Sequence, residues 1–174
     1  IYCTEMLHDY MRKGYGKMIF DHMKADLKKQ GFKGLLVDAT DIKEYMHYEH
    51  FLRQGFKVIK EHAPFKLMYF PLTKESINVK LIGLNYTPSK DRVEVTLFNN
   101  FFCPVGAYMY HLIKKAAQGF GDKVKIVEKE ATLQAVRKYG TAEPLINGKI
   151  KIFGPASQED VKKAIQEEIN QFKH

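Results

Sequence analysis

The sequence predicts a protein of class α/β, of the α+β kind, built from two small domains. The predicted elements follow the order β-α-β-α-β-β, and after a polar breaker the pattern starts again as β-α-β-α-β-β-α. A chain of 174 residues has room for two small domains, and 45% of the residues are hydrophobic without any long apolar run. We expect one domain over residues 1–72, a connection over 73–92 and a second domain over 93–174.

The first domain is predicted to begin with a strand, a glycine turn and a long helix. Residues 1–7, IYCTEML, are typical of a strand. Residues 15–30 have helical periodicity, the last turn carries two lysines that suit the helix dipole, and Gly31 is placed as a stop. The apolar positions that define the helical spacing are Met18, Ile19, Met23 and Leu27.

The remaining elements of this domain are shorter. GLLVDA, at 34–39, is an apolar run suited to a buried parallel strand. IKEYMHYEHFLRQ, at 42–54, is predicted as a helix. Two further strands are expected in GFKVIKE, at 55–61, and in FKLMYF, at 65–70.

The second domain alternates strands and helices before it closes with a hairpin and a helix. Strands are predicted in VEVTLF and VKIVEKE, and helices in CPVGAYMYHLIKKAA and TLQAVRKY. PLIN and KIKIF flank an Asn147-Gly148 turn, which is a strong hairpin signal. Ser157 and Asp160 resemble a capping box for a final helix, whose apolar stripe is Val161, Ala164, Ile165, Ile169 and Phe172.

Composition narrows the classes of function. The net charge of +8 favours anionic partners in general, but the lysines are scattered and no basic run alternates with exposed aromatics, so nucleic acid is an unlikely partner. No membrane span or signal peptide is visible, and we expect no membrane partner. Only two cysteines are present, which gives no disulfide framework and fits a cytoplasmic protein.

The stretch MRKGYGKMIF, at 11–20, places two glycines in front of the first long helix. Glycine has no Cβ, so backbone N–H groups are able to approach a ligand closely, and a helix start adds unpaired donors and a partial positive charge. This combination is the outline of an anion site, most often for phosphate. A flexible strand-to-helix turn with no ligand is the alternative.

The first domain resembles the C-terminal half of a GNAT-family N-acetyltransferase. The likeness is carried by Gly14 and Gly16 in RKGYGK and by FLRQGF at 51–56, which is similar to the Y/FxxxGF signature of that family. The resemblance implies that the glycine turn holds the pyrophosphate of acetyl-CoA on backbone amides and that the preceding strand binds the pantetheine arm. The residues implied to bind CoA are Met6, Arg12, Lys13, Gly14, Tyr15, Gly16 and Lys17.

The chain departs from the family at three places. Met11 stands where the family usually has arginine or glutamine, and Phe51 stands where many members have a tyrosine that acts as general acid. Phenylalanine has no proton to give, and helical spacing turns Tyr45 and Tyr48 to other faces. The family's first strands have no counterpart, so we expect the chain to be a fragment. Glu5, on the predicted first strand, is the remaining candidate for a catalytic base.

Two histidines invite a metal hypothesis. His47 and His50 are three residues apart in a predicted helix, with Glu44 one turn earlier. Zinc needs further converging ligands, and the sequence offers none that we are able to name. We therefore expect surface histidines and no metal.

The second domain resembles a thioredoxin-like domain. FFCPVG stands where that fold has its redox CxxC, at the start of a helix whose dipole favours a thiolate at Cys103. Pro144 opens a strand as the cis-proline of that fold does. Gly106 replaces the second cysteine, so no internal CxxC disulfide is expected. A monothiol role, a scaffold role without redox chemistry and an ordinary packed cysteine all stay open.

The combination of both halves is similar to the YoaP-like group of bacterial acetyltransferases. It implies an acetyl-CoA-dependent N-acetyltransferase with CoA as co-substrate and a small-molecule or peptide amine as acceptor. A homodimer is one possible assembly. The alternatives are a module that binds acyl-CoA or a partner without catalysis, and a monothiol redox protein that uses Cys103.

Overall fold

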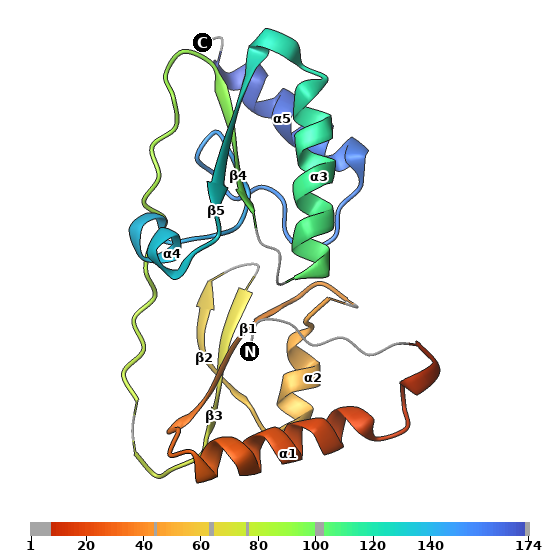
Figure 1. Ribbon diagram of the computed structural model, residues 1–174, viewed down its shortest axis with the longest axis vertical. Helices are drawn as coiled ribbons and strands as arrows, with labels where there is room; N and C mark the ends of the chain where they lie inside the picture. The colour runs from red at the N-terminus through yellow and green to blue at the C-terminus, as the bar shows by residue number, and fades with distance from the viewer. Residues whose placement is uncertain (1–7, 44, 63–64, 76, 100–102, 173–174) are drawn as a thin grey trace. The chain divides into compact units, whose positions relative to one another are not determined.

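The computed structural model shows a mixed α and β protein with two small sheets, which confirms the predicted α+β class (Figure 1). The structure describes residues 8–43, 45–62, 65–75, 77–99 and 103–172, except for the side chain of residue 62. The chain divides into two compact units, Ile1–Val79 and Lys80–His174. Within the described part of the chain, no helix has the length and apolar character needed to cross a membrane.

The first unit packs two helices on an antiparallel sheet of order β1-β3-β2. A short 3-10 helix, η1, precedes the first α-helix. The elements of this unit are η1 (His8–Tyr10), α1 (Tyr15–Lys29), β1 (Gly34–Thr40), α2 (Tyr48–Arg53), β2 (Lys57–His62) and β3 (Phe65–Pro71). The predicted first strand, 1–7, lies outside the described residues.

Helix α1 is present as predicted, but its buried side differs from the predicted stripe. Met18 and Ile19 are exposed, while Phe20 is buried against α2 and β1. Met23 and Leu27 are partly buried in the same core, so the stripe runs from Phe20 at intervals of three and four residues. Two adjacent apolar residues, Met18 and Ile19, gave the sequence pattern a second apolar face that the first unit does not cover.

The end of α1 confirms Gly31 as its stop. Gly31 has φ +80°, and its N–H bonds to the Lys28 carbonyl while that of Phe32 reaches the Leu27 carbonyl. This pair of bonds is a Schellman motif, which places a residue in the left-handed region where glycine is favoured. The chain then turns directly into β1.

We predicted β1 as a parallel strand, and this prediction is wrong for its pairing with β3. β1 pairs with β3 in antiparallel register from Gly34↔Pro71 to Thr40↔Phe65. Its side chains alternate between buried and exposed over Leu35–Asp38, as expected for a strand with one face on a core. The apolar run had suggested a strand covered on both faces.

The predicted helix over 42–54 is also wrong in its first half, because α2 begins only at Tyr48. The preceding residues fold back onto the end of β1: the Thr40 N–H donates to the Met46 carbonyl at 2.9 Å, and Thr40 Oγ1 donates to the Tyr45 carbonyl. Met46 has φ +47°, which is incompatible with a helix. Thr40 thus competes with the helix for these backbone groups.

The second unit carries helices on a sheet of order β5-β4-β6. β4 pairs with β5 in parallel and with β6 in antiparallel register. The elements of this unit are β4 (Val93–Asn99), α3 (Pro104–Gln118), η2 (Gly121–Lys123), β5 (Val124–Glu130), α4 (Leu133–Tyr139), β6 (Leu145–Ile146) and α5 (Gln158–Phe172).

The core of this unit lies between the sheet and helices α3 and α5. The predicted α5 stripe is confirmed, with four residues buried and Phe172 partly buried. The predicted capping box is confirmed as well: Ser157 Oγ accepts from the Asp160 N–H at 3.1 Å, and Asp160 Oδ2 accepts from the Ser157 N–H at 3.2 Å.

The closing hairpin is shorter than predicted. Asn147 and Gly148 have φ of +50° and +74°, which confirms the predicted turn. The strand predicted in KIKIF, 149–153, is wrong, because only Lys149 forms a bridge, to Ile146. Lys149 and Lys151 instead point their ammonium groups to Glu168 on α5, so this segment is fixed by ion pairs rather than by a ladder.

Candidate functional site

The glycine turn before α1 forms an exposed helix start without a side-chain cap. Gly14 is the N-cap residue, with φ +82°, and the first helical bond runs from the Met18 N–H to the Gly14 carbonyl at 3.1 Å. Among the described residues, the amides of Tyr15, Gly16 and Lys17 meet no hydrogen-bond partner. These N–H groups are the orphan donors of a helix N-terminus.

The two glycines of the turn have different reasons to be glycine. At Gly14 a Cβ would meet no atom within 4 Å, so the left-handed backbone is what favours glycine there. Gly16 lies inside the first turn of α1, where a Cβ would be 3.9 Å from Cε1 of His50. Both residues therefore have open space at the position of a Cβ. At Gly16 this space lies beside the His50 ring.

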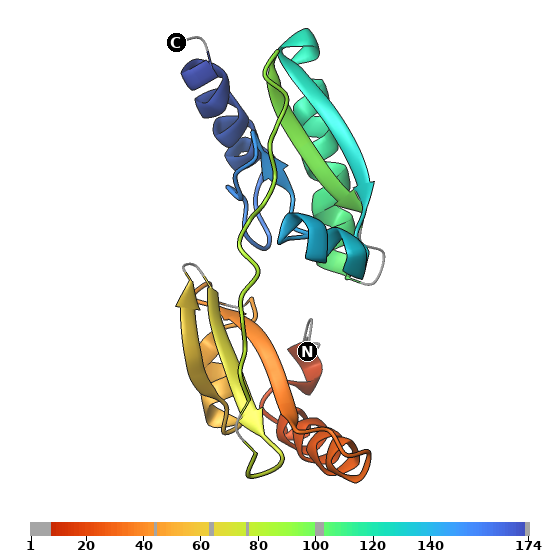
Figure 2. The same ribbon diagram turned by 90° about the vertical axis from the view of Figure 1, so that its left-hand side faces the viewer.

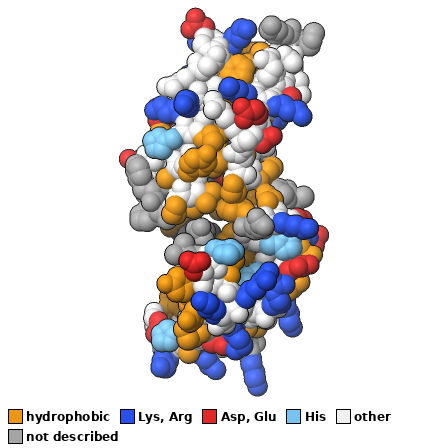
Figure 3. Space-filling model, turned by 90° about the vertical axis from the view of Figure 1, so that its right-hand side faces the viewer, with side chains coloured by type: hydrophobic (Ala, Val, Ile, Leu, Met, Phe, Trp, Pro, Cys, Tyr) orange, Lys and Arg blue, Asp and Glu red, His pale blue; other side chains and the backbone are white. Residues whose placement is uncertain are grey.

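Basic side chains surround this helix start unequally. Figure 3 views the side of the first unit where lysines, arginines and histidines gather among apolar side chains. Lys17 is held by Asp21 at 2.5 Å, and this hydrogen bond lowers the pKa of Asp21. Arg12 and Lys13 are exposed, with the Lys13 ammonium 5.8 Å from the centre of the Tyr10 ring. Lys17 is thus less free than Arg12 and Lys13 to meet an anion.

Two aromatic residues of helix α2, His50 and Phe51, pack against Phe20 on the buried side of α1. Phe51 is fully buried and packs edge-on against Phe20 and Phe56. His50 lies 5.7 Å from the Phe20 ring and is partly buried. Burial, with a smaller contribution from Arg53, lowers the pKa of His50 and favours the neutral imidazole.

The position of His50 is what the sequence interpretation missed. We expected a surface histidine, whereas its ring packs against the first turn of α1. No sequence signal indicated this partial burial, because it depends on how α1 and α2 pack. Within the described ranges, no group of three His, Cys, Asp or Glu residues is arranged to hold a metal ion. Glu5, Met6 and Glu44 lie outside the described residues.

The second candidate site is the start of α3. Cys103 is a free thiol, partly exposed, and it is the N-cap residue of this helix. Its Sγ accepts a hydrogen bond from the Gly106 N–H at 3.4 Å, and Pro104 occupies the first turn, as predicted. Pro144 is partly buried directly before β6, one residue beyond the Thr96↔Leu145 pair.

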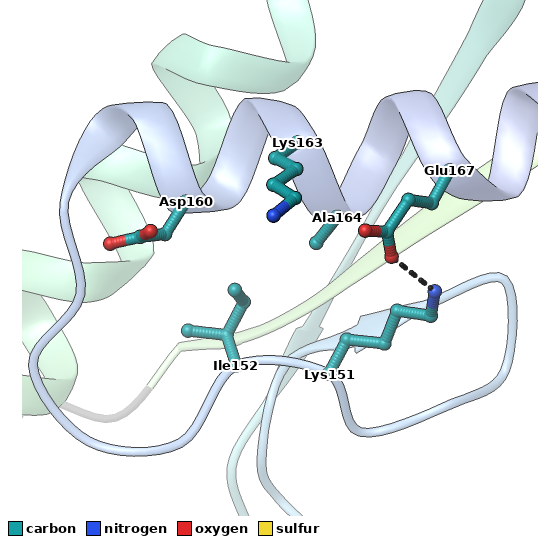
Figure 4. A pocket seen from close by; sticks show the side chains of 6 residues that line it. All are labelled: Lys151, Ile152, Asp160, Lys163, Ala164 and Glu167. Carbon is teal, nitrogen blue, oxygen red and sulfur yellow. Dashed lines mark hydrogen bonds and ion pairs between the residues drawn. The ribbon is translucent and has the colours of Figure 1, made fainter.

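A groove on the second unit was not predicted from the sequence. It has a volume of about 360 Å³ and lies between α5 and residues 151–152 (Figure 4). Lys151 and Lys163 line it together with Asp160 and Glu167, and Lys151 is paired to Glu167 at 3.2 Å. Its two basic and two acidic side chains give the lining no net formal charge.

No family model, curated protein or solved structure matches this chain. The two helix starts and the residues around them are therefore the features from which a function is inferred.

Proposed function

We propose that the first unit binds the phosphates of acetyl-CoA at the start of α1, as part of an acetyl-CoA-dependent N-acetyltransferase of the GNAT type. The observation that carries this proposal is the uncapped helix start at Gly14, with three amides that meet no described partner. Backbone N–H groups and the helix dipole suit a pyrophosphate. The exposed Arg12 and Lys13 would add charge-assisted contacts. The resemblance to the C-terminal half of the GNAT fold supports CoA among phosphate ligands.

The transfer step requires a proton acceptor for the amine and a donor for the departing CoA thiolate. The amine nitrogen attacks the thioester carbonyl, its proton leaves to a base, and the sulfur departs with the electron pair of the C–S bond. Phe51 is buried and has no proton to give. We keep Glu5 as the proposed base, and the amine acceptor is proposed only as a small molecule or peptide.

Calorimetry with a matched pair of glycine variants tests the binding site. Gly14→Ala and Gly31→Ala place alanine in the same left-handed backbone, with φ +82° and +80° and with no atom within 4 Å of the new Cβ. Gly14 begins α1 and Gly31 follows its end. We expect Gly14→Ala to weaken CoA binding about tenfold, because reorienting the first amides costs a charge-assisted bond.

The control variant Gly31→Ala should bind CoA as the unchanged chain does. Pantetheine, which lacks the phosphates, should bind much more weakly to all three chains. Equal CoA affinity in the unchanged chain and in Gly14→Ala would contradict the site, as would an equal loss in both variants. Binding without acetylation of any amine in a panel would favour the acyl-CoA binding module over the enzyme.

The thiol of Cys103 supports a second candidate function, a monothiol redox role. Its Sγ accepts the Gly106 N–H at 3.4 Å, lies at a helix start and is partly exposed. The thiolate would attack one sulfur of a small-molecule disulfide, forming a mixed disulfide and releasing the other sulfur as a thiolate. This thioredoxin-like role would belong to the second unit alone.

A further inference from the structure

The second unit includes a segment that the sequence had placed in the connection between domains. Residues 83–91, here called the strap, run along this unit past α4 to the start of β4 (Figures 1 and 2). The Asn85 N–H donates to the Tyr139 carbonyl at 2.8 Å, at the end of α4. A Cβ on Gly140 would collide with the Gly83 carbonyl, so the two backbones are in direct contact.

A buried carboxylate holds the strap at a second point. Glu94 on β4 has a side chain only 5% exposed. It accepts a hydrogen bond from Tyr86 Oη at 2.7 Å and from the Ser89 N–H at 3.3 Å. Both donors belong to the strap. Thr96 Oγ1, on β4 itself, donates to the same carboxylate at 3.1 Å. The Lys125 ammonium, on β5, lies 3.8 Å from Glu94 Oε2.

Aromatic packing adds to the attachment without burying the strap. The ring of Tyr86 lies 5.3 Å from that of Tyr139, and the Lys129 ammonium lies within 6 Å of both ring centres. Most strap residues are nevertheless exposed, including Leu84 at 45%. A segment with few buried apolar contacts opens at a lower free-energy cost than the core beneath it.

The strap covers a polar row on β4. Alternate residues of this strand, Val95 and Leu97, face the core of α3 and α5, whereas Glu94 and Thr96 face the other way. Glu94 and Thr96 are 4% and 0% exposed, although their side chains are polar. A charged group buried this far is stabilised only while its donors stay in place. Two of the donors belong to the strap, so the strap and the carboxylate depend on each other.

We propose that residues 83–91 form a releasable strap, latched by Glu94, which opens as a unit while the rest of the second unit stays folded. Opening exposes the Glu94 and Thr96 face of β4 to solvent. This conformational device is independent of the proposed CoA site. The second unit then has two states: the strap covers this face of the sheet in one and leaves it uncovered in the other.

Amide hydrogen exchange on the full chain tests the latch, with Glu94→Gln as the main variant. The substitution keeps the shape of the side chain and removes the charge that strengthens the bonds from Tyr86 and Ser89. We expect the Asn85 amide to exchange about tenfold faster, because its own bond to Tyr139 is untouched and only opening of the strap exposes it. The Ile113 amide, in the buried middle of α3, should exchange at its original rate.

The matched control is Glu128→Gln. Glu128 also accepts from a tyrosine, Tyr110, and pairs with a lysine, but it joins α3 to β5 and does not touch the strap. This control should leave Asn85 unchanged. Tyr86→Phe, which removes one hydroxyl, should accelerate Asn85 in the same direction and decides the question if Glu94→Gln does not fold. Unchanged exchange at Asn85, or equal acceleration at Asn85 and Ile113, would overturn the proposal.

Discussion

At the scale of single residues, Cys103 joins a thiol to the first turn of a helix. The Gly106 N–H donates to its sulfur at the start of α3. The residue is only partly exposed, so the surrounding side chains limit access to the sulfur. Its reactivity therefore decides between a redox thiol and a packing residue.

We predict that Cys103 reacts with iodoacetamide faster in the native chain than in the same chain unfolded in urea. A Cys3→Ala background leaves one thiol, and mass spectrometry follows its alkylation. An added small-molecule disulfide should give a mixed disulfide at Cys103, since Gly106 provides no resolving thiol. Slower labelling in the native chain would identify the thiol as protected, and the redox role would be discarded.

Single residues also explain where sequence-based reasoning succeeded. Gly31 and the Ser157–Asp160 box were predicted because their effect on the backbone is local. The buried side of α1 was not, because Met18 and Ile19 are as apolar as Phe20 and only tertiary packing distinguishes them. The environment of His50 depends on the same packing, between α1 and α2, and no short sequence motif records it.

At the scale of elements, α5 and the closing hairpin are joined by a buried carboxylate. Glu168 is fully buried on α5 and accepts hydrogen bonds from Asn147, Lys149 and Lys151. Burial acts to raise the pKa of Glu168, but the hydrogen bonds from the two lysines and Asn147 outweigh it, so the pKa lies below its ordinary value of 4.5. The ionised form therefore stabilises the folded unit.

We predict that Glu168→Gln lowers the free energy of unfolding at pH 7 by about 3 kcal/mol, because two lysines lose a buried partner. The folded-state pKa is depressed, so this stabilisation is complete above pH 4.5 and is lost as the pH falls through the lower value. The gap between the two chains in urea unfolding should shrink as the pH is lowered from 4.5 through the depressed pKa of Glu168.

The matched control is Glu167→Gln, on the same helix. Glu167 pairs with Lys151 at 3.2 Å, but its side chain is 49% exposed. Its loss should cost below about 1 kcal/mol, as for other solvent-exposed ion pairs. Equal effects of the two variants, or a gap that does not change with pH, would show that Glu168 does not act through its charge.

Contacts between elements also explain three predictions that were wrong. The residues of KIKIF alternate in polarity as a strand does, but their lysines are taken by α5, which is distant in sequence. The direction of β1 depends on β3, which follows about thirty residues later. In the predicted helix over 42–54, hydrogen bonds from Thr40 hold the first half in a non-helical conformation. Long-range partners decided the first two cases, and a local hydrogen-bonding residue decided the third.

At the scale of the whole molecule, the two units divide between Val79 and Lys80. Residues 83–91 therefore belong to the second unit, although their polar composition is typical of a linker. The contact of Gly83 with Gly140 is the closest backbone approach that fixes this boundary among the glycines of the described chain. Gly140 also has φ +76° where α4 ends.

We predict that Gly140→Ala lowers the free energy of unfolding of the second unit by at least about 2 kcal/mol, because strain at positive φ is added to a collision with backbone. Urea unfolding measures the change. Gly121→Ala is the control: Gly121 has φ +55°, but a Cβ there meets no atom within 4 Å. If both variants lose the same stability, the contact with Gly83 contributes nothing.

Titration of the isotope-labelled chain with acetyl-CoA, followed by backbone amide chemical shifts, tests the central claim most directly. The claim is that the start of α1 binds phosphate through uncapped N–H groups. We predict that the largest saturable shifts belong to the amides of Tyr15, Gly16 and Lys17, and that inorganic pyrophosphate moves the same amides. Shifts that are largest at the start of α3, or no saturable shift in residues 12–17, would contradict the claim.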